Sequence, residues 1–218
     1  MNKNSGFVAG TLVHTDKGLV PIQNIKVGDM VLSLPENGEG ETAYKRVIQT
    51  FAMEDQFVWV IELSGKINHS DEFKEEFLFI SPYHQFWTFT NVSRDFIDDN
   101  SGKWASVLDL EMGSPLLRYD CEFAGSFDIH RLYQTTEPDK AFYMVFPSYD
   151  AGIFLDVKAY KNNQLLVPNY FEDESLEVVN WDENEDPIAD EYIDTIYNLE
   201  VEDFHTYFVG ELGVWVHQ

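Results

Sequence analysis

Hydrophobic and polar positions alternate, or form short apolar runs, along most of the chain. The clearest runs are Met30–Leu34, Phe57–Leu63, Glu76–Ile80, Gln85–Phe89 and Ala141–Phe146. Runs of this length and period predict β-strands, and clusters of Gly, Asp and Asn separate them as turns do. No long segment combines a 3.6-residue period with helix-capping residues. The pattern therefore predicts an all-β fold.

Two segments share one pattern, with two apolar positions, a Gly-polar pair and two further apolar positions. They are Ile22–Leu32 (IQNIKVGDMVL) and Val107–Leu117 (VLDLEMGSPLL). Each lies upstream of a strand-like run that carries a histidine, His84 in one case and His205 in the other. This arrangement indicates a duplicated β unit. The alternative is that two ordinary turn-strand units look alike.

Composition and charge narrow the class of protein. The 218 residues are 44% hydrophobic and 15% aromatic, which favours a folded protein with its own core. The formal net charge of −25 would repel a phosphate backbone, so we expect no binding of nucleic acid. No apolar run reaches 18 residues and no signal peptide is recognisable, so we expect no membrane association.

Cysteine and histidine usage gives no sign of a metal or cofactor. A single cysteine, Cys121, allows neither an intrachain disulfide nor a cysteine-rich zinc site, and we interpret it as an apolar filler. The histidines His14, His69 and His130 lack metal-ligand spacing with one another or with Cys121. We expect His14 to be a structural residue of a strand. The sequence predicts no cofactor and no metal site.

The two ends of the chain carry the most specific motifs. The last segment, Tyr197–Gln218 (YNLEVEDFHTYFVGELGVWVHQ), has one histidine inside a strand-like run and another at the penultimate position. The opening segment is Gly6–Asp29 (GFVAGTLVHTDKGLVPIQNIKVGD). Both resemble the ends of Hint domains, the hedgehog and intein autoprocessing fold, and most closely the Hint modules of bacterial polymorphic toxins, which typically read CFVAGT and VHN. Two matched ends are harder to obtain by chance than one.

The resemblance implies a horseshoe of two intertwined, pseudo-symmetric β halves. It covers roughly residues 6–120 and 192–218, so we expect a Hint domain formed by residues 1–120 and 192–218. Residues 121–191 are longer than the connection that small Hint domains have. We interpret them as an inserted β-rich elaboration that ends in a solvated acidic connector, Asp182–Glu191.

The resemblance also implies a function. Such a domain cleaves or splices the peptide bonds at its own termini, so its substrates are its own flanking segments in cis. It acts once, as a self-cleaving domain rather than as a turnover enzyme. The toxin-type modules imply a C-terminal toxin module as cargo and a larger precursor in the bacterial cytoplasm that is secreted or delivered to a target cell.

At the upstream end the family places a cysteine where this chain has Gly6. Glycine offers no nucleophile for an acyl shift, so we expect this step to be lost there. An engineered block, which we favour, and a degenerate natural site are both open interpretations. Ser5 is a conceivable substitute hydroxyl, but one residue of displacement should place it on the wrong face of the strand.

The segment Ser81-Pro82-Tyr83-His84 resembles the Thr-x-x-His motif of the family. The resemblance implies that His84 hydrogen-bonds the upstream scissile amide and that the hydroxyl of Ser81 helps to orient that bond. Without the resemblance this segment is a turn with a structural histidine. An ordinary hydrolase built on Ser81 and His84 is disfavoured, because the nucleophile elbow of such enzymes is missing.

At the downstream end His205 and His217 match the two family histidines, and Gln218 stands in the place of the terminal asparagine. Asparagine cleaves the following bond by closing a five-membered imide, whereas glutamine would close a six-membered one more slowly. Asn198 stands where many splicing inteins have aspartate, which favours release over ligation; it is equally interpretable as a structural amide. With Gly6 and Gln218 together, we expect the chain to be inactive as it stands.

The competing hypothesis comes from another class of function. The chain could be a non-catalytic β module whose acidic elaboration binds a chaperone, a secretion component or an immunity protein, with vestigial histidines.

Overall fold

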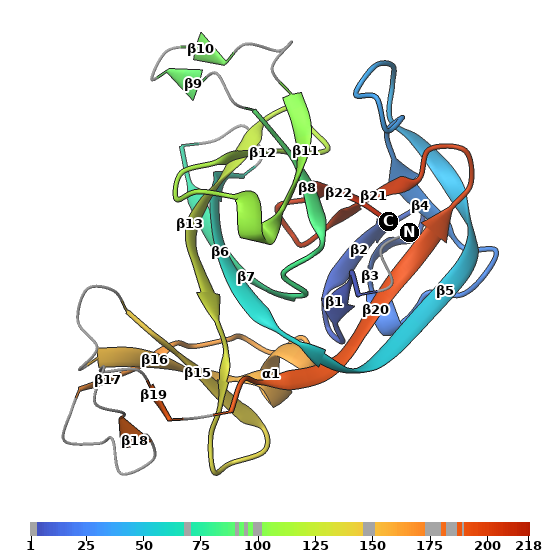
Figure 1. Ribbon diagram of the computed structural model, residues 1–218. Helices are drawn as coiled ribbons and strands as arrows, with labels where there is room; N and C mark the ends of the chain where they lie inside the picture. Colours follow the sequence, from blue (N-terminus) through green and yellow to red (C-terminus); the bar gives the residue numbers. More distant parts are fainter. Residues whose placement is uncertain are drawn as a thin grey trace.

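The fold is described from a computed structural model (Figure 1). The structure describes residues 4–67, 71–89, 92–93, 96–97, 102–145, 151–172, 180–181, 187–188 and 190–218. Three sequence expectations lie outside or partly outside these residues: the histidine at position 69, the end of the strand expected to reach Phe146, and most of the acidic connector expected at Asp182–Glu191.

Within the described residues, the largest sheet contains fourteen strands. Its strands are β1 (Phe7–Val8), β2 (Leu12–Thr15), β3 (Gly18–Pro21), β4 (Met30–Ser33), β5 (Ala43–Phe57), β6 (Trp59–Lys66), β7 (Phe73–Ile80), β8 (Gln85–Phe89), β11 (Gly102–Ser106), β12 (Pro115–Leu117), β13 (Phe123–Arg131), β20 (Ile193–Val201), β21 (Thr206–Val209) and β22 (Val214–His217). The described residues are mostly β-structured, with the short α-helix α1 (Val157–Lys161) and short 3₁₀ turns between strands, in agreement with the all-β prediction.

The large sheet curves back on itself. The strand order is β11-β8-β12-β13-β6-β7-β1-β20-β5-β4-β2-β21-β22, and β22 also pairs with β8. The join is the antiparallel pair of Val216 and Phe86. In Figure 1 the long strands β5, β6, β7, β13 and β20 form the curved outer wall, with the short β1 and β22 inside it. The last strand of the chain therefore lies within the body of the domain.

The two segments with the shared sequence pattern adopt the same order of elements. The first forms a 3₁₀ helix, η1 (Ile22–Asn24), followed by β4, and the second forms η3 (Val107–Asp109), followed by β12. In both cases the residue after the helix donates its N–H to the carbonyl of the first helical residue. Each segment is followed by a strand of the large sheet, as the duplicated unit of a Hint fold requires.

The elaboration forms a second sheet below the first (Figure 1). Its strands are β14 (Tyr133–Gln134), β15 (Lys140–Met144), β16 (Ala151–Asp156) and β17 (Asn169–Glu172). Two further strand pairs are β9 (Val92–Ser93) with β10 (Phe96–Ile97), and β18 (Asn180–Trp181) with β19 (Pro187–Ile188). Strand β13 pairs with β6 and β12 in the large sheet, so the strands of the second sheet all follow Arg131. The domain boundaries expected at residues 121 and 191 stay a prediction.

A short α-helix follows directly after β16. Helix α1 (Val157–Lys161) begins where the Asp156 side chain accepts a hydrogen bond from the N–H of Ala159, at 2.8 Å. An aspartate in this position satisfies a backbone donor that the first turn leaves free. Tyr160 then anchors the helix to the large sheet, since its hydroxyl lies 2.7 Å from that of Thr11.

Two apolar clusters hold the molecule together. The larger one fills the horseshoe with fully buried side chains from both halves, among them Phe7, Phe86 and Tyr207. The second joins the elaboration to the large sheet through buried residues such as Phe79 and Leu155. The elaboration therefore shares a core with the Hint body. None of the helices in the described part of the chain is long and apolar enough to cross a membrane.

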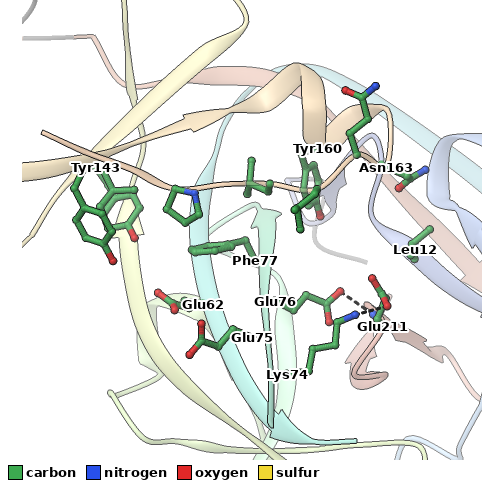
Figure 2. A pocket seen from close by; sticks show the side chains of 17 residues that line it. Leu12, Glu62, Lys74, Glu75, Glu76, Phe77, Tyr143, Tyr160, Asn163 and Glu211 are labelled. Atoms are coloured by element: carbon green, nitrogen blue, oxygen red, sulfur yellow. Dashed lines mark hydrogen bonds and ion pairs between the residues drawn. The ribbon is translucent and has the colours of Figure 1, made fainter. Parts of the chain in front are cut away.

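A cleft of about 530 Å³ lies between β7 and the segment that follows α1 (Figure 2). Four carboxylates line it, those of Glu62, Glu75, Glu76 and Glu211, with Lys74 between them. Glu76 accepts hydrogen bonds from the backbone N–H of Glu211 (2.7 Å) and of Leu212 (3.0 Å). Its carboxylate thus braces the turn between β21 and β22. The cleft contains none of the residues that the sequence nominates for chemistry.

Candidate functional site

The upstream end of the chain enters the fold as the short strand β1, which lies between β20 and β7. Phe7 pairs with Tyr197 on one side and with Ile80 on the other. Since alternate residues of a strand share a face, Ser5 points to the same side as Phe7. The hydroxyl oxygen of Ser5 lies 2.7 Å from Nδ1 of His84, and the Phe7 ring packs edge-on against the same imidazole at 4.4 Å.

Gly6 faces the opposite way, against the backbone of β20. A Cβ atom at this position would lie 2.5 Å from the carbonyl oxygen of Tyr197, which is closer than a real Cβ contact. Glycine at position 6 is therefore what lets β1 approach β20. The expectation that position 6 faces the site and Ser5 faces away is wrong for this structure. Neighbouring residues do face opposite sides, as expected, but it is Ser5 that faces His84 and position 6 that faces β20.

Ser81 holds the backbone on both sides of Ser5. Its N–H donates to the carbonyl of Gly6 at 2.9 Å, and its hydroxyl donates to the carbonyl of Asn4. The turn that follows β7 positions the serine, because the N–H of Tyr83 in turn donates to the Ser81 hydroxyl oxygen at 3.2 Å. A side-chain donor therefore lies on the carbonyl group that precedes Ser5.

Asn198 on β20 contacts the same residue from the other side. Its side-chain oxygen Oδ1 accepts hydrogen bonds from the Tyr207 hydroxyl (2.7 Å) and from the backbone N–H of Leu199 (2.8 Å). These two donors fix the orientation of the amide. Its Nδ2 consequently faces Ser5, at 3.1 Å from the backbone carbonyl oxygen and 3.3 Å from the hydroxyl oxygen.

This upstream cluster is closed to solvent. Ser5 is 3% exposed, His84 0% and Asn198 1%. Burial lowers the pKa of His84 to about 3, and the nearby charge of His217 acts in the same direction. The imidazole is therefore neutral at neutral pH. Burial likewise raises the pKa of the Tyr207 phenol, which keeps that hydroxyl a donor to Asn198.

The downstream end is formed by the loop before β21 and the last residue after β22. His205 has a positive φ of 58°, an unusual backbone conformation for a residue with a side chain. Its carbonyl accepts the N–H of Gln218 at 3.1 Å, and its Nδ1 lies 2.8 Å from Nε2 of the same glutamine. Because an amide nitrogen can only donate, Nδ1 of His205 is the acceptor.

An irregularity in β20 fixes the other half of the glutamine amide. The register between β20 and β5 shifts between Glu200 and Val201, as it does at a β-bulge. The N–H of Val201 donates to Oε1 of Gln218 at 2.6 Å. The side-chain oxygen of Gln218 is thereby held by the strand, which leaves its nitrogen facing His205.

His217 contacts the carbonyl of the last residue. Its Nδ1 lies 3.1 Å from the backbone oxygen of Gln218 and its Nε2 lies 3.2 Å from a carboxylate oxygen of Glu36. Both partners are oxygen atoms, so only the doubly protonated ring donates to both at once. The Trp104 ring packs edge-on against this imidazole at 5.1 Å and donates its indole N–H to the Glu36 carbonyl at 3.0 Å.

Strand β20 connects the two ends of the chain. Asn198 contacts Ser5, while Val201, three residues further along, contacts Gln218. At about 3.3 Å of rise per residue these contact points are roughly 10 Å apart. Figure 1 shows β1, β20 and the end of the chain gathered in the same region of the fold.

A sequence profile comparison identifies the family. The profile of the pretoxin HINT domain matches residues 12–170, which is more than half of the 218 residues. The chain belongs to the pretoxin HINT domain family. No curated protein matches it.

Solved structures agree with this HINT assignment at the level of the fold. A bacterial intein-like domain from Clostridium thermocellum matches with 21% sequence identity and a TM-score of 0.57, covering 98% of each chain. The Ssp DnaB mini-intein variant M86 matches with 11% identity and a TM-score of 0.50, covering 100% of this chain and 97% of the other.

The HINT fold brings the sequence-nominated residues into two neighbouring groups. Asn198, Ser81 and His84 surround the upstream end, and His205, His217 and Gln218 form the downstream end. Gly6 lies beside the first group without a side chain to contribute. The roles assigned to these residues remain predictions.

Sequence reasoning missed three residues that the HINT fold brings to these groups. They are Ser5, which it assigned to the wrong face, Tyr207, which orients Asn198, and Glu36, which faces His217. The alternation of β1 held the signal for Ser5, because the bulky Phe7 marks the buried face. Glu36 lies in a turn distant in sequence from His217, and no local pattern links the two.

Two other histidines of the described residues, His14 and His130, lie outside both groups. His14 contacts the carbonyl of Gly210 at 2.9 Å, and His130 stacks on Tyr143 with ring centroids 4.4 Å apart. Among the residues that the structure describes, no cluster of three or more His, Cys, Asp or Glu side chains could hold a metal ion.

Proposed function

We propose that this pretoxin HINT domain is an autoprocessing module that cleaves the peptide bond following Gln218. The cargo would be a toxin module C-terminal to the domain, released from a larger bacterial precursor that is secreted or delivered to a target cell. The observation that carries the proposal is the contact of 2.8 Å between Nε2 of Gln218 and Nδ1 of His205. That contact pairs an amide nucleophile with a proton acceptor.

The chemistry of the step balances within the site. Nε2 of Gln218 attacks its own backbone carbonyl carbon and gives a proton to Nδ1 of His205. The C–N bond to the next residue breaks, and the leaving amine takes a proton from the His217 ring. The domain would then end in a six-membered imide. His217 supports this role because its Nδ1 lies 3.1 Å from the carbonyl oxygen that gains charge in the attack.

Two features favour release over splicing. Gly6 supplies no acyl acceptor at the position where the family has a cysteine, so a branched intermediate cannot form there. Asn198 carries no charge, and its amide is engaged by Tyr207 and Ser5. The six-membered ring closure should make release slower than the closure of a five-membered ring by asparagine. We therefore propose slow release after Gln218 in place of the inactivity expected from Gly6 and Gln218 together.

The test is a folded reporter fused directly after Gln218, followed by intact mass over hours to days. We expect a free reporter that begins with the first residue after position 218. The remaining domain should be one water lighter than its free acid until the imide hydrolyses. His217→Ala and His205→Ala should each lower the rate by about a hundredfold or more.

The matched control is His130→Gln, which removes a histidine of β13 that lies outside both groups and should leave the rate unchanged. Persistence of the full-length fusion in a folded protein would favour the competing hypothesis, a non-catalytic β module that binds a chaperone, secretion component or immunity protein. Release that continues at the same rate in His217→Ala would remove the role given to that residue.

A further inference from the structure

The strand that leads into the domain presents one hydroxyl to the buried imidazole. Ser5 contacts His84 at 2.7 Å, whereas a side chain at position 6 would collide with the Tyr197 backbone. The residue that faces the catalytic histidine of a HINT domain is therefore displaced by one position in this chain. The bond that can be attacked is displaced with it.

We propose that Ser5 is the acyl acceptor of an upstream processing step and that the bond cleaved there is Asn4–Ser5. This extends the proposed autoprocessing function to the other end of the chain and rests on it. Ser5 would then supply the nucleophile that Gly6, which has no side chain, cannot supply.

Three donors or acceptors are arranged around this bond. His84 Nδ1 accepts the Ser5 hydroxyl proton, since Nδ2 of Asn198 already donates toward the same oxygen at 3.3 Å. The Ser81 hydroxyl donates to the Asn4 carbonyl oxygen, the atom that would gain negative charge. A donor held on that oxygen before the reaction begins is the arrangement that stabilises a tetrahedral intermediate.

The reaction uses only groups present in the cluster and water. The Ser5 oxygen attacks the Asn4 carbonyl carbon while its proton passes to Nδ1 of His84. The C–N bond of Asn4–Ser5 breaks, and the Ser5 nitrogen takes that proton back from the imidazolium. The product is an ester of Asn4 on the Ser5 oxygen with a free amino group. Water then hydrolyses the ester to free Asn4 carboxylic acid and a domain that begins at Ser5.

The state of the histidine suits this exchange. His84 is fully buried, and with Nδ1 as the acceptor the neutral ring carries its proton on Nε2, which has no hydrogen-bond partner in the structure. Burial lowers its pKa, so that the ring is neutral and able to accept at neutral pH. The same burial makes a lasting positive charge unfavourable, which returns the proton to the leaving amine.

A second route to the same cleavage is the side chain of Asn4 itself. An asparagine can close a cyclic imide on its own carbonyl and expel the next residue, which would also free Ser5. The two routes differ in the residue they require. Asn4→Ala removes the cyclisation and leaves the Ser5 hydroxyl in place, whereas Ser5→Ala does the opposite.

The experiment places a folded tag upstream of residue 1 and a folded reporter after Gln218 in one polypeptide. Upstream and downstream products are then separated by intact mass, with and without neutral hydroxylamine, which intercepts esters. We expect a domain that begins at Ser5, with Ser5→Ala lowering its formation at least about a hundredfold. Asn4→Ala should keep it within a few-fold, and its hydroxylamine product should end in a hydroxamate at position 4.

Ser5→Cys gives a second measurement with the same geometry. A thiol in this position should form a thioester, so that a small thiol such as dithiothreitol releases the upstream tag at least about tenfold faster than from the unchanged chain. Ser81→Ala should lower upstream cleavage by about a hundredfold through loss of the donor on the Asn4 carbonyl.

Several results would overturn the assignment. A new amino terminus at Gly6, equal cleavage in Ser5→Ala, or loss of cleavage in Asn4→Ala alone would each contradict it. So would an intact upstream bond under hydroxylamine, or under thiol in Ser5→Cys, in a chain whose circular dichroism shows it to be folded. If the upstream bond stays intact but the reporter is still released, only the role proposed for Ser5 is refuted. Upstream cleavage without reporter release would refute only the step at Gln218.

Discussion

The upstream and downstream ends of this HINT domain carry similar residues in opposite environments. The upstream histidine, His84, is 0% exposed, whereas the side chain of His217 at the downstream end is 25% exposed. His84 faces a hydroxyl and an apolar ring, while His217 faces the Glu36 carboxylate and a carbonyl oxygen. Burial lowers the pKa of His84 and keeps that imidazole neutral, so it can accept a proton, whereas the partners of His217 are both oxygen atoms to which its ring nitrogens can donate.

Because their surroundings differ, His84 and His217 cannot substitute for each other. In the acyl shift proposed upstream, His84 returns the proton to the nitrogen of Ser5, so the shift itself needs no water. Water is needed only for the later hydrolysis of the ester. The downstream step that we propose would expel a segment from the domain, and the partly exposed His217 lies where that segment could leave. Four measurements test whether the two ends act independently.

The largest effect is expected for His84→Gln. Glutamine fits a similar volume and can hydrogen-bond Ser5, but it cannot carry a proton. Upstream cleavage of the double fusion should fall by about two to four orders of magnitude. Release of the reporter after Gln218 should change less than about threefold, because Gln218 contacts other imidazoles. A comparable loss at both ends would show that the two sites form one catalytic unit.

The second measurement is the pH dependence of stability, compared between the unchanged chain and His84→Gln. The folded pKa of His84 is about 3, below the ordinary value of 6.5. As pH falls from 6.5 toward 3, the unfolded chain takes up a proton at this residue and the folded chain does not. Stability from a neutral His84 is therefore present above pH 6.5 and is lost on acidification.

The loss should approach about 1.4 kcal/mol per pH unit within that window. Urea unfolding at pH 7, 6, 5.5 and 5 measures it, with the His84→Gln curve subtracted to remove the carboxylates that both proteins share. Two parallel curves would contradict the burial of a neutral imidazole. A difference that grows toward acid pH supports it.

The third measurement is Tyr207→Phe. The change removes the hydroxyl that donates to Asn198 and keeps the ring that packs in the core. We expect a loss of about 1 kcal/mol in the free energy of unfolding. Upstream cleavage should fall several-fold because the Asn198 amide is less firmly oriented. Tyr44→Phe, on an exposed tyrosine, is the matched control and should leave both quantities unchanged.

The smallest effect is expected for Glu36→Gln. The carboxylate lies 3.2 Å from Nε2 of His217 but is itself 54% exposed, so solvent weakens the interaction. Reporter release should fall only about two- to fivefold, and its rate should become less sensitive to salt. Upstream cleavage is the internal control. A rate that does not change at low salt would show that His217 needs no help from this carboxylate.

Much of this arrangement was predictable from the order of residues. The strands over Gln85–Phe89 and Met30–Leu34 follow from alternation, and the duplicated segments adopt matching helix and strand pairs. The 15-residue strand β5 was not anticipated, because only one of its side chains is fully buried and its apolar and polar residues do not alternate strictly. Helix α1 was also missed, because a five-residue helix gives little periodicity beyond its aspartate cap.

The sequence indicated which histidines would gather at the two ends of the chain, but not which side chain of β1 would face His84. Motif spacing located His84, His205 and His217, whose identity alone marks them. The face to which Ser5 or Gly6 turns depends on how closely β1 approaches β20, and that distance is a property of the assembled sheet. A single residue of displacement reverses every side chain of a strand. The same holds for contacts across turns, such as the one between Glu36 and His217.

The bulge at Val201 has a consequence for timing. Its N–H and the ring of His205 are set at the reach of a glutamine side chain. An asparagine, shorter by one carbon–carbon bond of about 1.5 Å, would not span both contacts without a movement of the backbone. The two contacts therefore fit glutamine, which should cyclise more slowly than asparagine. We expect it to behave as a built-in delay, which lets carrier and cargo travel as one polypeptide before they part.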